Sequence, residues 1–170
     1  MRVASLIGAV LLVVSLAGCA GYKLGPSNGM AAGSRSVQIN LFENKTFEPR
    51  LAEAVGIALR RTMQQDGTYR LDTAGSGDVV VTGVLTKYER LSLSFQPRDI
   101  ISTRDFEIRL HAHVTAVDRG TGKTVLDRDV VGRTTLRYKV DLASTERQTL
   151  PVLADDLARN ITSLLADGTL

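Results

Sequence analysis

The sequence predicts an α+β fold, a two-layer sandwich in which two helices cover one face of a mostly antiparallel four-stranded sheet. Two segments, 49–65 and the stretch from about Thr149 onward, repeat apolar residues at three-to-four spacing, as amphipathic helices do. Four stretches have the composition of strands: 37–41, 78–95, 106–116 and 124–140. The element order is therefore β-α-β-β-β-α, in one domain over residues 37–170.

The first strand and helix have clear boundaries. Residues 37–41 alternate, 42–48 turn the chain, and Pro49 suits the first turn of a helix. A left-handed cap at Gly67 is expected to end this helix after Asp66. Residues 69–71 then continue as a short extended piece.

The next strands form a hairpin-rich sheet. Apolar parity breaks within 78–95, which predicts a bulge near Gly83 or a strand that projects past its sheet. Even positions of 106–116 are apolar, whereas odd positions such as His111 and His113 are polar. Residues 118–123 form a hairpin loop before 124–140. The polar positions predict a sheet face that contacts water or a partner.

The last helix carries its apolar stripe on five residues: Leu150, Leu153, Leu157, Ile161 and Leu164. Because Pro151 lacks a backbone donor, this helix either starts near Thr149 or kinks there. Gly168 follows its end.

The N-terminus predicts a lipoprotein signal peptide over residues 1–18. Arg2 precedes an apolar run at 3–16, which is shorter than the roughly 20 residues of a membrane-spanning helix. Leu16-Ala17-Gly18-Cys19 follows, so we expect cleavage before Cys19 and covalent diacylglycerol and an acyl chain (palmitate) on it. Residues 19–36 are then a lipidated cysteine and a flexible tether. Ala20, where aspartate would retain the protein at the inner membrane, favours lipid anchoring at the outer membrane.

Composition and motifs exclude several functions. Removal of residues 1–18 leaves 20 of the 21 basic residues against all 18 acidic ones, and the chain has no Trp, which disfavours nucleic-acid binding. There is no nucleophile elbow, no zinc-protease motif and no cysteine besides Cys19, so an enzyme is not expected. His111 and His113 have zinc-like spacing, but exposed strand histidines without a third ligand are the preferred interpretation, and no metal or other cofactor is expected.

The order of these pieces resembles the lipopolysaccharide-assembly lipoprotein LptE family. The resemblance is carried by the Cys19 lipobox, then Phe42-Glu43-Asn44-Lys45-Thr46-Phe47-Glu48-Pro49, the first helix closed by Asp66-Gly67, and Gly77-Asp78-Val79-Val80-Val81-Thr82-Gly83 before the long strand. It covers nearly the whole mature chain, although no single piece is a catalytic-grade signature.

The resemblance implies a non-enzymatic outer-membrane lipoprotein that plugs an LptD-type β-barrel translocon, at the periplasmic face or in the barrel lumen. The pair inserts lipopolysaccharide into the outer leaflet. A polar sheet face suits a polar lumen, and lipid on Cys19 raises the effective concentration for barrel assembly.

Lipopolysaccharide carries phosphates, so a contact would need exposed Lys or Arg. The candidates are inferred from their place in the pattern: Lys87, Arg90, Arg98, Arg104, Arg133, Arg137 and Lys139. The alternative for each is a solvated strand face of mixed charge. Two other functions stay open: an envelope lipoprotein acting as an auxiliary subunit of a transport or secretion system, and a periplasmic small-ligand binding module.

Overall fold

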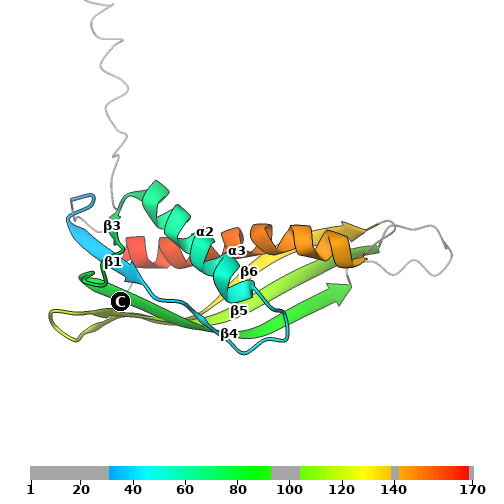
Figure 1. The fold of residues 1–170 in the computed structure, drawn as a ribbon, viewed down its shortest axis with the longest axis horizontal. Helices are drawn as coiled ribbons and strands as arrows, with labels where there is room; N and C mark the ends of the chain where they lie inside the picture. The colour runs from blue at the N-terminus through cyan, green and yellow to red at the C-terminus, as the bar shows by residue number, and fades with distance from the viewer. Residues whose placement is uncertain (1–30, 93–103, 139–141, 169–170) are drawn as a thin grey trace, which may run out of the picture.

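A computed structural model describes residues 31–92, 104–138 and 142–168, with backbone alone at 104–105, 137–138 and 142–147 (Figure 1). The sequence of elements is β1 (Arg35–Ile39), β2 (Glu43–Asn44), α2 (Leu51–Asp66), β3 (Tyr69–Asp72), β4 (Val79–Ser92), β5 (Arg104–Asp118), β6 (Thr124–Tyr138) and α3 (Leu142–Asp167). Cys19, Arg98 and Lys139 lie outside the described residues.

The α+β class is confirmed: α2 and α3 pack together over one face of a sheet (Figure 1). That sheet has six strands in the order β3-β1-β4-β5-β6, with β2 also paired to β4, so the prediction of four strands is wrong. β2 and β3 are two and four residues long, too short to produce a readable alternation. Both long pairings, β4 with β5 and β5 with β6, are antiparallel, whereas β1 and β2 pair in parallel.

The core lies between the sheet and the helices. Every even position of β5 from Ile108 to Ala116 is buried, which confirms the predicted alternation. Leu153, Leu157 and Ile161 of α3 are fully buried as well. Gly132 of β6 lets α3 approach closely, because an added Cβ would lie 2.7 Å from Leu157 Cβ.

Helix boundaries differ from the prediction in two places. Pro49 lies before α2, which begins at Leu51 after Arg50 in a left-handed conformation (φ 68°). A start of α3 near Thr149 is also wrong, because α3 begins at Leu142 and continues through the exposed Pro151. Gly67 does end α2 in the expected left-handed cap, and its N–H donates to Met63 O at 3.2 Å.

The bulge of β4 lies at Thr86, between Leu85 and Lys87, and not near Gly83. Gly83 instead makes room for the ring of Phe42, which would lie 2.4 Å from an added Cβ. Beyond the bulge the parity of β4 reverses. Lys87 and Glu89 therefore pair with His111 and Arg109 on the face away from the helices.

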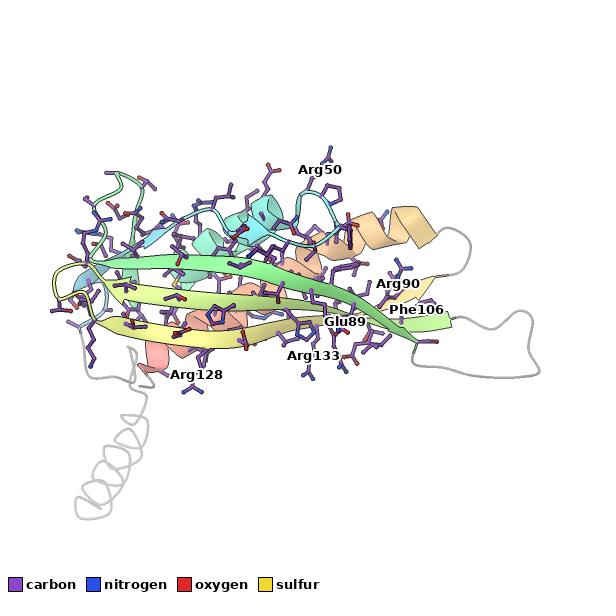
Figure 2. All side chains as sticks on the ribbon, turned by 90° about the horizontal axis from the view of Figure 1, so that it is seen from below. Arg50, Glu89, Arg90, Phe106, Arg128 and Arg133 are labelled. Atoms are coloured by element: carbon purple, nitrogen blue, oxygen red, sulfur yellow. The ribbon has the colours of Figure 1, made fainter. Side chains whose placement is uncertain are left out.

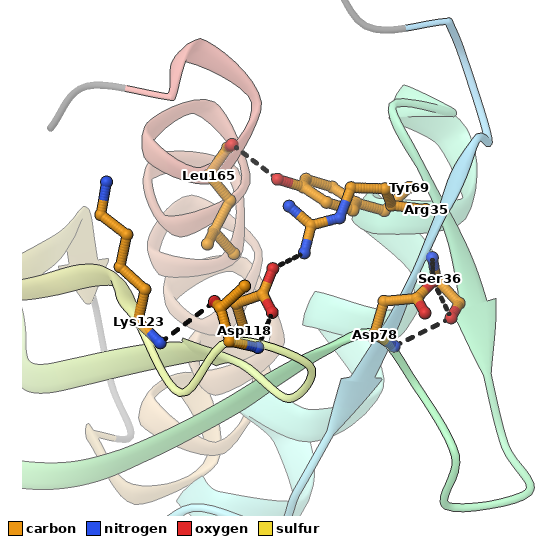
Figure 3. Close-up of polar contacts among 8 residues, drawn as sticks. Arg35, Ser36, Tyr69, Asp78, Asp118, Lys123 and Leu165 are labelled. Atoms are coloured by element: carbon orange, nitrogen blue, oxygen red, sulfur yellow. Dashed lines mark hydrogen bonds and ion pairs between the residues drawn. The ribbon is translucent and has the colours of Figure 1, made fainter.

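Polar contacts tie β1 to the β5–β6 hairpin near the point where the described chain begins (Figure 3). Arg35 forms an ion pair with Asp118, and the Ser36 N–H and hydroxyl both donate to Asp78 Oδ2 at 2.7 Å. Arg35 and Ser36 both belong to β1, which starts at Arg35, two residues before the start predicted from the sequence. At the same end, Tyr69 OH donates to Leu165 O at 3.4 Å, and burial raises the pKa of Tyr69.

Candidate interaction surface

The face of β4, β5 and β6 that the helices leave uncovered is polar along its length (Figure 2). We call it the open face. Its charged or titratable residues are Lys87, Glu89, Glu107, Arg109, His111, His113, Asp127, Asp129 and Arg133. The alternation of β5 predicted this polar face, and the structure confirms it.

Glu89 lies at the centre of a cross-strand network on the open face. Its carboxylate accepts from Lys87 Nζ at 2.6 Å and contacts His111 Nε2 at 2.8 Å. The hydrogen bond from Lys87, followed by that from His111, holds the pKa of Glu89 below its usual range. Glu89 is therefore an anion at neutral pH that orients two neighbours.

His113 lies between two carboxylates of β6. Its Nδ1 is 2.9 Å from Asp129 Oδ1, and its Nε2 is 3.0 Å from Asp127 Oδ1. The hydrogen bond to Asp129 is the main cause that raises the pKa of His113, with Asp127 contributing. Both ring nitrogens are therefore engaged by carboxylates. Within the described residues, no group of three or more metal-ligating side chains is found.

Further along the open face, away from the hairpin, the charge becomes basic. Arg109 forms an ion pair with Glu107, whose pKa is lowered chiefly by this hydrogen bond. Arg133, directly opposite Arg109 in the strand register, is exposed. Lys87, Arg109 and Arg133 thus lie beside two carboxylates, Glu107 and the Glu89 opposite Arg109. One positive charge is left in excess, which suits a partner or ligand carrying negative charge.

The structure separates the predicted basic residues. Lys87 and Arg133 lie on the open face, on either side of β5. Arg90 pairs with the buried Ile108 and so belongs to the other face, because the bulge at Thr86 reverses the parity. Arg104 lies in β5 and Arg137 in β6, at positions where the structure describes the backbone alone. The role of these residues as lipopolysaccharide contacts stays a prediction.

Sequence reasoning missed the loop between β2 and α2. Phe47 is fully exposed there, and Arg50 adopts its left-handed conformation. Phe47 belongs to the segment that carried the family resemblance, which is the one signal in the sequence that singled it out. Nothing in residue types predicts the backbone of Arg50.

The two-layer architecture and its polar open face do not by themselves identify a protein family. Comparison with known proteins does. The model of the LptE family, whose description is lipopolysaccharide assembly, matches residues 34–165. The chain belongs to the LptE family. Membership places it among the proteins of lipopolysaccharide assembly in the cell envelope. A search of curated proteins finds no match.

Solved structures share the fold of this LptE-family chain. A protein from Xanthomonas campestris superposes with a TM-score of 0.55 at 9% identity, covering 86% of this chain and 92% of its own. A hypothetical protein from Chlamydia trachomatis superposes with a TM-score of 0.53 at 10% identity, covering 76% of this chain and 94% of its own. An uncharacterised lipoprotein B from Nitrosomonas europaea has a TM-score of 0.47 at 13% identity, covering 86% of this chain and 88% of its own. At these identities the likeness concerns the fold alone. Among the described helices, none is long and apolar enough to span a bilayer.

Proposed function

We propose that the chain is a non-enzymatic outer-membrane lipoprotein, anchored through Cys19, that occupies the lumen of an LptD-type β-barrel during lipopolysaccharide insertion. Family membership supplies the process. The observation that carries the plug role is the open face, where a long sheet surface presents ion pairs and histidines instead of an apolar patch.

A barrel wide enough to pass a glycolipid has a polar interior, and a domain inside it must present polar groups that remain hydrated or paired. The pairs centred on Glu89 and His113 satisfy this requirement, since each carboxylate has a cationic or imidazole neighbour. A buried apolar interface would require instead a large uncovered apolar patch.

The basic part of the open face supports a contact with lipopolysaccharide phosphates. Arg109 and Arg133 are neighbours across the β5–β6 pair, and Lys87 lies on the adjacent strand. Guanidinium groups bind phosphate through paired hydrogen bonds. Arg98, Arg104, Arg137 and Lys139 complete the proposed set near the same end of the strands in the sequence.

The experiment is an affinity purification of the full-length protein, with its own signal intact, from detergent-solubilised outer membranes. Quantitative mass spectrometry then identifies what accompanies it. We expect one large β-barrel protein in near one-to-one amount, and strong loss of it with Cys19→Ala, which removes the anchor. Inner-membrane transporter subunits in place of the barrel would contradict the proposal and favour the auxiliary-subunit function.

A further inference from the structure

The loop between β2 and α2 is held in one conformation by its own side chains. We call residues 45–50 the crest. Asn44 Oδ1 accepts from Thr46 N at 3.0 Å and from Thr46 Oγ1 at 2.7 Å, while Asn44 Nδ2 donates to Glu48 O at 2.9 Å. These bonds bracket Phe47, whose relative exposure is 107%. The crest therefore presents an aromatic ring to solvent from a fixed backbone.

Two hollows border the crest. One, of about 390 Å³, is lined by Lys45, Lys87, Tyr88 and Arg90 as well as by the crest itself. The other, of about 440 Å³, is lined by Pro49 and Arg50 with Leu150 and Pro151 of α3. Phe47 thus lines the hollow with basic side chains, and the mainly apolar hollow begins one residue further along the crest, at Glu48.

Cations outnumber carboxylates in the linings of the two hollows. Lys45, Arg50, Lys87 and Arg90 line the two hollows, against Glu48 as the one carboxylate in either lining. Glu43 lies 3.7 Å from Lys45, and Glu89 lies 2.6 Å from Lys87, so these two cations have neighbours of opposite charge. Arg50 has no ion pair within the described part of the chain. Within the described residues, Arg50 is thus a cation available to a carboxylate of a partner.

The backbone conformation of Arg50 is also unfavourable, because its φ is positive (68°). A left-handed conformation is unfavourable for a residue other than glycine, and Arg50 makes no side-chain cap bond to α2 in return. Glycine would start the helix at lower cost. Such strain is concentrated at functional sites, and here it lies at the end of the crest, where Figure 2 shows the Arg50 side chain extending away from the sheet.

We propose that the crest is the surface by which the chain docks onto its protein partner, with Phe47 entering an apolar pocket whose rim carries carboxylates. The inference rests on the proposed function in taking that partner to be the β-barrel protein. Exposed aromatic and arginine side chains are the usual centres of binding energy, and a preformed loop loses little entropy on binding. A membrane surface fits less well, because the crest offers one exposed apolar ring beside concave hollows instead of a broad apolar surface.

The test compares Phe47→Ser, Arg50→Gly and a matched control, Ile57→Ser, in the full-length lipidated protein expressed in the native host. Ile57 is an exposed apolar residue (59%) of α2 outside the crest. We expect Phe47→Ser to lower the barrel recovered per lipoprotein by about tenfold or more, as loss of a central aromatic does. Arg50→Gly should lower it by a smaller factor, and Ile57→Ser should leave it unchanged. Thermal unfolding midpoints should not fall for any of the three, since Phe47 and Ile57 are exposed and glycine relieves position 50.

Equal recovery of the barrel by the wild type and both crest variants would overturn the docking inference while leaving the proposed function intact. If the wild type recovers no barrel, the proposed function fails and the inference fails with it. A photoreactive phenylalanine analogue at position 47 separates the other occupants. A crosslink to the barrel supports the inference, whereas crosslinks to lipid or to a second copy of this chain overturn it.

Discussion

At the scale of single residues, the open face is built from side chains that hold one another in place. Glu89 joins Lys87 to His111, and His113 joins Asp127 to Asp129. Exposed pairs of this kind add little stability. Their effect is to keep a long sheet face charged without leaving it strongly of one sign, which suits contact with a hydrated surface.

His113 makes folding stability depend on pH. Its folded pKa is raised, so its contribution is present below the unfolded pKa of about 6.5 and is lost as the pH rises through the folded pKa. We predict that His113→Gln lowers the thermal midpoint at about pH 5.5, and that the gap from wild type narrows above neutrality. Melting curves across this pH range measure it. In an Asp127→Asn, Asp129→Asn background the gap should no longer vary with pH; a gap that widens with pH would contradict the assignment.

Gly132 is predicted to be required for the packing of α3 on β6. An added Cβ would lie 2.7 Å from Leu157 Cβ and 2.8 Å from Leu157 N. Gly132→Ala should therefore lower the free energy of unfolding by about 1–3 kcal/mol, the usual cost of overpacking. Urea denaturation measures the change. Gly120→Ala is the control, since its nearest neighbour would be 3.5 Å away; equal losses in both variants would contradict the packing argument.

At the scale of elements, the sequence predicts what periodicity encodes. The alternation of β5 and the stripe of α3 specify their buried faces, because pattern and burial have the same period. The predicted position of the β4 bulge, near Gly83, is wrong. A break in the apolar alternation indicates that a bulge exists, whereas the pairing with β5 determines at which residue it lies. Glycine is common at bulges, which is why the bulge was expected at Gly83. Glycine is required there instead because a larger residue would clash with the ring of Phe42.

The candidate site was predictable only in part. The polar face of β5 follows from its odd positions. Lys87 and Arg133 are exposed on their strands, and their role as lipopolysaccharide contacts stays a prediction. The face on which Arg90 lies depends on the bulge, so it could not be read from residue types. The crest depends on side-chain bonds of Asn44 and on one left-handed residue, which periodicity does not report.

α3 protects the outer edge of β6, the last strand of the sheet in the described residues. Asp156 Oδ2 accepts from Arg133 N at 2.8 Å, and Asn160 Nδ2 donates to Val131 O at 2.9 Å. We predict that Asp156→Ala combined with Asn160→Ala exposes two edge groups and promotes concentration-dependent self-association. Light scattering on size-exclusion chromatography of the detergent-solubilised protein detects it. The pair Arg159→Ala and Ser163→Ala, on the same helix, should leave the mass unchanged; similar masses for both double variants would count against edge protection.

At the scale of the whole molecule, the two ends of the sandwich differ. The end where the described chain begins is closed by polar contacts of Arg35, Ser36 and Asp78 with their neighbours (Figure 3). The basic part of the open face and the crest lie further along β4, β5 and β6. The proposed lipid anchor at Cys19 would join the first end, with the proposed contact groups toward the other, and so give the domain a direction relative to the membrane.

Photo-crosslinking from two opposite faces of the domain in living cells determines whether a barrel surrounds it. A photoreactive residue replaces Thr82 on the open face in one variant and Ile57 on the outer side of α2 in another. We predict that both positions crosslink to the same β-barrel protein, because a lumen encloses both faces. Crosslinks to the barrel from one face alone, or to other proteins, would contradict enclosure.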